Sequence, residues 1–322
     1  MADPDSGQIE QVHLTAGDVS LTLLTLGCIT QDWRVPLGGA RTSVVLGYAD
    51  PRAYLDNRAS LGIIAGRVAN RIAGSRFELD GKVHHLMPND GPNHLHGGPD
   101  GLSHRIWNVD RDGARRARFT YVSPDGEGGY PGNVECVVEV SLTGHTVTYD
   151  MAATPDRPTP INLAQHNYYA LASGPCHDQT LMIAASNYTP TGPDLIPTGQ
   201  IAPLDGAAFD FRKPRSLAAA DPECHGIDHN YVLDLIDGPA ARLTATTGLT
   251  LEMETDQPGL QLYTATHLAP FETPLSGQQH AFFAGLCLEP QGFPNAVNEP
   301  GFPSIIATPD YPYRQVLRVT IG

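Results

Sequence analysis

Hydrophobic and polar residues alternate with a period of two along several stretches of the chain. From 134 to 142 every even position is apolar, whereas Glu135 and Glu139 fall between them. Gly144 interrupts the pattern, and a second alternation runs from 146 to 151. Because successive side chains of a strand point to opposite faces of a sheet, these stretches are predicted strands joined as a hairpin.

The same pattern recurs elsewhere. Residues 77 to 83 carry an Asp-Gly turn between short alternating flanks, and apolar residues alternate again from 317 to 321. The 33 Gly and 28 Pro are spread along the whole length, which leaves little room for helices of ordinary size. The sequence therefore predicts an all-β fold, a large antiparallel β-sandwich with few short helices. Two stretches, 123 to 132 and 190 to 203, are rich in turn residues and are predicted loops, which commonly build sites on β scaffolds.

Composition favours one globular unit. A chain of 322 residues can hold two average domains or one large all-β unit, and no linker divides it, so we expect a single domain over residues 1–322. Hydrophobic residues make up 41 % and charged residues 17 %, enough for a sizeable core and too little charge for a disordered chain. The formal charge of −15 argues against binding to nucleic acid or to anionic membranes and leaves small neutral ligands as partners.

The sequence contains no targeting or redox signal that we recognise. Residues 1–8 are acidic and polar and lack the basic start and apolar core of a signal peptide. No apolar stretch is long enough to span a bilayer. The five cysteines are irregularly spaced without a CxxC pair, so neither a disulfide framework nor a structural zinc site is indicated. We expect a cytoplasmic protein.

One carboxylate is the first candidate for chemistry. Glu289 ends the apolar run 286 to 288, and a buried unpaired charge is so unfavourable that such a residue is partnered, reaches water or serves proton transfer. Taken singly, each candidate is more often a structural or surface residue, so only the set has meaning. The other polar residues in short Gly- or Pro-flanked contexts are Arg67, His96, His166 and Asp228.

Three chemistries can use this set. In an extended segment His94 and His96 point the same way, and His166, Asp228 or Glu289 could complete a cupin-like metal shell. Against this, the segment lies between Gly-Pro and Gly-Gly pairs and lacks the Glu that follows in cupins. The second chemistry, nucleophilic hydrolysis, is disfavoured because the sequence contains no Gly-x-Ser-x-Gly elbow. The third chemistry is general acid–base catalysis by a His and a Glu on a neutral polyol.

Five segments together resemble, in order, the successive motifs of the aldose 1-epimerases, the galactose mutarotase family. They lie at residues 66–72, 91–98, 162–169, 228–230 and 288–294 and so extend over nearly the whole chain. The resemblance implies a β-supersandwich of the galactose mutarotase type and interconversion of the α and β anomers of a free aldose. It also implies a site without metal or cofactor, a monosaccharide as partner, and a monomer or weak homodimer.

The resemblance also implies roles for individual residues. Glu289 matches the general base and His166 the general acid. We expect Glu289 to be ionised, favoured by a cation such as Arg67, and His166 to be protonated, favoured by a nearby carboxylate. The residues that match sugar-binding positions are Arg67, Asn70, His96, Asp228 and Gln261.

The preferred sugar stays open at this stage. Pro290 stands where the family often has Thr, and Asn295 where it often has Asp, and loops decide between aldoses that differ by one hydroxyl. The acidic chain shows no basic cluster for a phosphate, which favours unphosphorylated sugars. A sugar-binding or sensing protein without catalysis on the same fold is the competing function, and it would bind sugar without accelerating anomer exchange.

Overall fold

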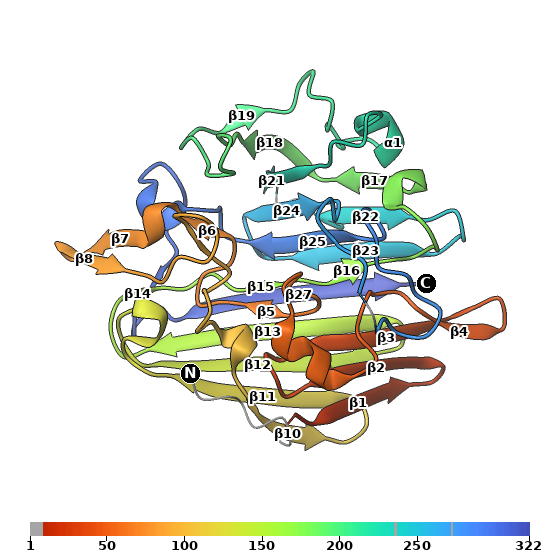
Figure 1. Ribbon diagram of the computed structural model, residues 1–322, viewed down its shortest axis with the longest axis horizontal. Coiled ribbons are helices and arrows are strands. Elements are labelled where there is room, and N and C mark those ends of the chain that lie inside the picture. The colour runs from red at the N-terminus through yellow and green to blue at the C-terminus, as the bar shows by residue number, and fades with distance from the viewer. Residues whose placement is uncertain (1–8, 235–236, 272) are drawn as a thin grey trace.

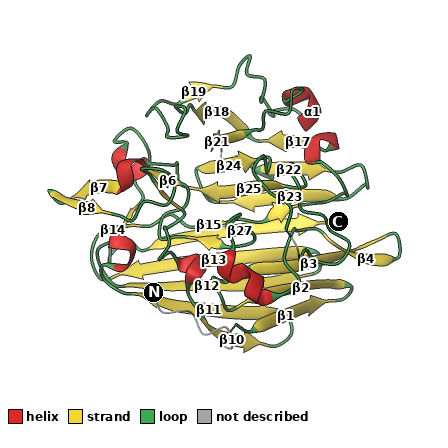
Figure 2. Cartoon of the chain, in the orientation of Figure 1, coloured by secondary structure: helices red, strands yellow, loops and turns green. Residues whose placement is uncertain are grey.

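A computed structural model describes residues 9–234, 237–271 and 273–322, and antiparallel strands dominate it (Figures 1 and 2). The predicted hairpin is confirmed as β12 (Val134–Thr143) and β13 (Thr146–Pro155), in which buried and more exposed residues alternate. Both belong to a nine-stranded sheet. Its strands follow the spatial order β10 (Asn108–Asp112), β11 (Arg116–Ser123), β12, β13, β27 (Tyr313–Ile321), β23 (Thr250–Thr255), β22 (Ala241–Thr244), β17 (Thr180–Ile183) and β20 (Arg215–Ser216).

A six-stranded sheet forms the second large layer. Leu262 and Leu288 on this sheet share one hydrophobic core with Leu243 and Leu251 of the nine-stranded sheet, so the two sheets pack face to face and the predicted sandwich is confirmed. The strands of the six-stranded sheet follow the order β16 (Tyr168–Tyr169), β25 (Leu286–Gln291), β24 (Gly259–Tyr263), β21 (Asp228–Leu233), β18 (Ala185–Thr189) and β19 (Ala202–Pro203).

Smaller sheets complete the fold. A four-stranded sheet, seen at the lower right of Figure 1, consists of β1 (Gln11–Ala16), β2 (Val19–Leu24), β3 (Thr30–Leu37) and β4 (Ala40–Ser43). Two-stranded pairs join β5 (Ile64–Ala65) to β15 (Ala164–Gln165), β6 (Arg71–Ile72) to β9 (His94–Leu95), β7 (Arg76–Leu79) to β8 (Lys82–His85), and β14 (Thr159–Pro160) to β26 (Ile306–Ala307). The predicted Asp-Gly turn is confirmed between β7 and β8, where Asp80 and Gly81 both have positive φ.

Helical structure is confined to short segments, as predicted. The described residues contain one short α-helix, α1 (Leu217–Ala220). They also contain 3-10 turns at Pro51–Asp56, Ala73–Ser75, Leu102–His104, Glu127–Gly129, Cys176–Asp178 and Ala296–Asn298. Among the described residues no helix has the length and apolar character needed to cross a membrane. The acidic segment 1–8, in which we expected no signal peptide, lies outside the described residues. All five cysteines are free, and only Cys224 among them is exposed.

Candidate active site

Three of the candidate residues, Asp228, Gln261 and Glu289, lie on one face of the six-stranded sheet. Leu286 and Leu288 of β25 point into the core, so Cys287 and Glu289 point to the opposite face. The register between β24 and β25 places Gln261 directly beside Glu289. Alternation along the strand therefore explains why an apolar run can end in a carboxylate that faces away from the core.

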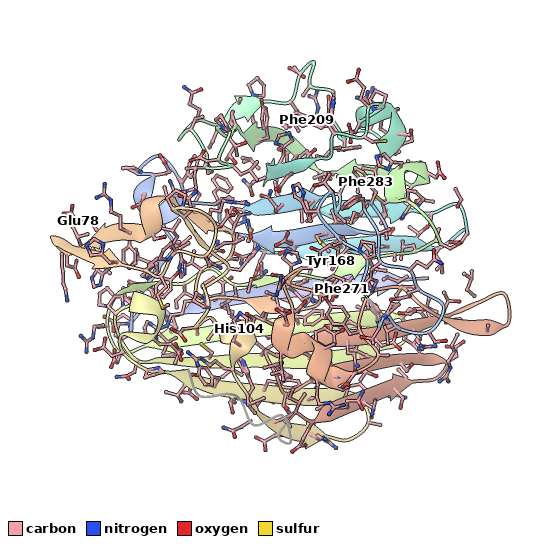
Figure 3. All side chains as sticks on the ribbon, viewed as in Figure 1. Glu78, His104, Tyr168, Phe209, Phe271 and Phe283 are labelled. Atoms are coloured by element: carbon pink, nitrogen blue, oxygen red, sulfur yellow. The ribbon has the colours of Figure 1, made fainter. Side chains whose placement is uncertain are left out.

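His166 and Glu289 face each other across a short gap. His166 follows β15, and its backbone N–H donates to the carbonyl of Ile63. Its Nε2 lies 3.6 Å from Oε1 of Glu289, and both side chains are almost fully buried. The other ring nitrogen, Nδ1, lies 3.6 Å from Sγ of Cys287. The ring of Tyr168, labelled near the middle of Figure 3, packs against the ring of His166.

His96 is held by reciprocal hydrogen bonds with Asn70. The His96 N–H donates to the Asn70 carbonyl at 3.1 Å, and the Asn70 N–H donates to Nδ1 of His96 at 3.2 Å. Because Nδ1 accepts, the neutral ring carries its proton on Nε2. Both residues have positive φ, 53° for His96 and 60° for Asn70, a conformation that these bonds support. His96, His166 and Glu289 each offer a ligand atom within 4.8 Å of the others.

Asp228, Gln261 and Arg71 form the polar surroundings of this cluster. The Gln261 amide donates to Oδ1 of Asp228 at 2.5 Å. The Gln261 Oε1 and the Glu289 Oε2 are both buried and have no hydrogen-bond partner among the described residues. Arg71 donates to Asp90 at 2.7 Å. Two buried acceptors are thus left open for hydroxyl donors such as those of a sugar.

Burial favours the neutral forms of both central groups. It lowers the pKa of His166 to about 4 and raises the pKa of Glu289 well above its usual range. The Asp228 carboxylate adds to the rise for Glu289, and Arg71 opposes it. This differs from our expectation of an ionised Glu289 beside a protonated His166, because the loss of hydration outweighs the nearby charges. Both arrangements nevertheless hold one proton between the two groups.

Comparisons with known proteins decide the family. Residues 10–320 match the family model described as aldose 1-epimerase. The chain is 39 % identical over 316 residues to the galactose mutarotase of Rattus norvegicus, covering 95 % of this chain and 92 % of that protein. It is 35 % identical over 298 residues to the aldose 1-epimerase of Escherichia coli K12, covering 88 % and 86 %. The chain belongs to the aldose 1-epimerase family. The predicted class of enzyme, an isomerase of this family, is confirmed.

Solved structures confirm the aldose 1-epimerase fold. An aldose epimerase homologue from C. elegans superposes with a TM-score of 0.93 at 26 % identity, covering 98 % of this chain and 99 % of that chain. A galactose 1-epimerase from Lactobacillus acidophilus gives 0.86 at 25 % identity, covering 100 % and 97 %. The predicted galactose mutarotase-like sandwich is therefore the fold of this family member.

Arg67 lies differently from what we expected of a sugar-binding residue in an aldose 1-epimerase. Its buried guanidinium donates to Oγ and the carbonyl of Ser123 and to the carbonyls of Pro124 and Pro131. These acceptors belong to Ser123, the last residue of β11, and to the turn-rich stretch that follows it up to residue 132. The cation whose charge acts on Glu289 is Arg71 instead. The physical reason is that the loop offers Arg67 four acceptors, which satisfy its buried donors.

His94, which the disfavoured cupin-like alternative would pair with His96, has partners of its own. Nδ1 of His94 lies 2.7 Å from the Met87 carbonyl, and its ring packs edge-on against Tyr130. His94 and His96 therefore do not form the paired imidazoles that a cupin-like site requires. Among the described residues, the cluster of His96, His166 and Glu289 does not include His94.

Two residues of the site were missed by the sequence reasoning. Arg71 lies in the same segment, 66–72, as Arg67, but the sequence did not indicate a role for it. Cys287 precedes Glu289 by two positions, and the period of two in β25 was a sufficient signal that both share a face. A surface hollow of 660 Å³, lined by residues that include Ser43, Leu46 and Phe282, contains none of the candidate residues. The candidate site is therefore identified by the chemistry of its side chains and not by the volume of a cavity.

Proposed function

We propose that this protein interconverts the α and β anomers of a free, unphosphorylated aldose by opening and closing its ring. The observation that carries the proposal is the pair formed by Glu289 and His166, whose Oε1 and Nε2 lie 3.6 Å apart on the polar face of the six-stranded sheet. A carboxylate and an imidazole at this separation can act on two oxygens of one sugar, the anomeric hydroxyl and the ring oxygen.

The proposed reaction needs only these two proton carriers. Glu289 removes the proton of the anomeric hydroxyl, the bond between C1 and the ring oxygen breaks, and His166 gives its proton to that oxygen. Rotation about C1–C2 then presents the other face of the aldehyde. His166 takes the proton back, the ring closes, and Glu289 returns a proton to the anomeric oxygen.

The proton count of the site fits this cycle. Before ring opening the pair holds its single proton on His166, and in the open-chain stage it holds it on Glu289. Burial favours the second arrangement. One proton transfer between the two groups interconverts these arrangements, so no cofactor is required in the proposal.

The remaining polar groups are proposed to orient the sugar. His96 offers an Nε2 donor, and Gln261 and Asp228 offer acceptors to hydroxyl groups. We add Arg71 to this set and assign Arg67 to the support of the loop 123–132. Arg71 is paired with Asp90 and lies among further carboxylates, which disfavours a phosphorylated sugar. We also propose a cytoplasmic protein that is a monomer or weak homodimer.

Polarimetry tests the proposal directly. The relaxation of freshly dissolved α-galactose, α-glucose, xylose and arabinose should be faster with the purified protein, and galactose is tested first because the name of the Rattus norvegicus relative specifies it. We expect Glu289→Gln and His166→Ala to lose about 10²- to 10⁴-fold in rate. The exposed Glu254→Gln serves as the control. Saturable sugar binding without any acceleration would instead support the binding-protein alternative.

A further inference from the structure

The triad of His96, His166 and Glu289 also has the composition of a metal site. Two imidazoles and one carboxylate are a ligand set that Zn²⁺ uses in proteins, with a fourth position open to water. In this fold the three residues come from separate parts of the chain and offer one ligand atom each within 4.8 Å. The arrangement is distinct from the His94–His96 pair, which the structure does not form.

The ring nitrogens that would bind a metal are free of other partners. In His96 the Asn70 N–H occupies Nδ1, and in His166 Nδ1 meets the thiol of Cys287. Nε2 of each ring is thus the atom left for a ligand. Glu289 adds a buried Oε2 without a hydrogen-bond partner among the described residues.

The distances are close to those that an ion requires. Two donor atoms on one tetrahedral Zn²⁺ lie about 3.4 Å apart, given bond lengths of about 2.0–2.2 Å. Nε2 of His166 and Oε1 of Glu289 are already 3.6 Å apart. The three ligand atoms all lie within 4.8 Å of one another, so the widest pair would have to approach by about 1.4 Å to share one ion. His96 is partly exposed, so an ion can reach the triad from solvent.

We propose that His96, His166 and Glu289 bind a divalent transition-metal ion, for which Zn²⁺ is the probe, and that this ion excludes the sugar from the site. The ion would occupy the two proton carriers and is therefore an inhibitor rather than a cofactor. Its inhibitory consequence rests on the proposed acid–base function, whereas binding of the ion does not.

Calorimetry with zinc chloride tests the binding. The protein is used without a histidine tag, after treatment with a chelator, in a Cys224→Ser background that removes the exposed thiol beside His225. We expect one ion per chain. Each of His96→Ala, His166→Ala and Glu289→Gln should weaken zinc binding more than about tenfold. The exposed His85→Ala serves as the matched control and should leave zinc binding unchanged.

Competition and inhibition complete the experiment. Saturating galactose should weaken the apparent zinc affinity, and zinc should slow mutarotation until EDTA restores it. Absence of zinc binding at millimolar concentration, or zinc binding that the three triad variants leave intact, would overturn the inference. Simultaneous binding of zinc and sugar would overturn it as well. Zinc binding at the triad of a protein that never accelerates mutarotation would refute the proposed function and leave the metal site standing.

Discussion

Arg67 and Arg71 are four positions apart in the sequence, yet their side chains occupy different environments. The guanidinium of Arg67 is buried under the loop 123–132 and meets four oxygen acceptors there. Arg71 pairs with Asp90 and acts electrostatically on Asp228 and Glu289. The first arginine therefore supports a loop, whereas the second opposes the rise in the pKa of Asp228 and of Glu289 that burial causes.

Substitution should separate these two roles. Arg71→Gln is expected to lower kcat/KM by roughly 10- to 100-fold with little change in thermal stability, because it removes a cation from the site. Arg67→Gln is expected to destabilise the fold by about 2–4 kcal/mol, because buried acceptors lose their donors. Polarimetry and thermal unfolding on both variants provide the measurements. A larger loss of kcat/KM in folded Arg67→Gln than in Arg71→Gln would reverse the assignment.

The sequence identified the residues of the candidate site more reliably than the side-chain directions of their neighbours. His96, His166 and Glu289 were named from motifs, and the structure brings them together. Arg67 and Arg71 lie in a segment in which only Ile64–Ala65 and Arg71–Ile72 are strands and Asn70 has positive φ. Where the backbone is irregular, no fixed period relates sequence position to side-chain direction, so the sequence did not distinguish the two arginines.

At the scale of elements, a close backbone contact positions His96. Gly97 has a φ of 89°, and a Cβ atom on it would lie 1.7 Å from the carbonyl oxygen of Gly66. That oxygen also accepts a hydrogen bond from the N–H of Leu102. The segment that carries His96 is thus packed directly against the segment that leads to Asn70, which keeps their reciprocal hydrogen bonds in place.

Gly97→Ala should therefore disturb both stability and activity. The substitution introduces a clash with backbone in addition to an unfavourable positive φ, and we expect a destabilisation of roughly 2–4 kcal/mol. Gly81→Ala is the matched control, since Gly81 has a φ of 73° and open space around its Cβ position. Chemical denaturation measures both variants, and mutarotation rates follow the displacement of His96. Equal destabilisation of the two would show that the close contact is unimportant.

At the scale of the whole molecule, the sequence did not predict the order of the strands in the sheets. The alternation from 317 to 321 predicted a strand, confirmed as β27 (Tyr313–Ile321). Nothing in that pattern indicated that β27 lies between β13 and β23, in the middle of the nine-stranded sheet. Pairing partners far apart in sequence are chosen by packing of both faces at once, which a local period does not encode.

The sandwich also buries histidines that make its stability depend on pH. Burial lowers the pKa of His229 in β21 to about 4 from an ordinary 6.5. Its ring packs against Phe209, labelled near the top of Figure 3, with 4.1 Å between ring centroids. Between the two pKa values the unfolded chain binds a proton that the folded protein does not. Stability is therefore fully present above pH 6.5 and is lost as the pH falls toward 4.

His229→Phe should remove this part of the acid sensitivity. At pH 5 the wild-type His229 opposes folding by about 2 kcal/mol relative to neutral pH, a value that follows from the two pKa values. The variant should consequently lose fewer degrees of Tm between pH 7 and pH 5 than the wild type. The exposed His225→Gln controls for the loss of a histidine as such. Because His166 is buried with a similar pKa of about 4, part of the acid sensitivity should persist in His229→Phe. An unchanged difference in Tm would mean that protonation of His229 is accommodated in the folded state without loss of packing.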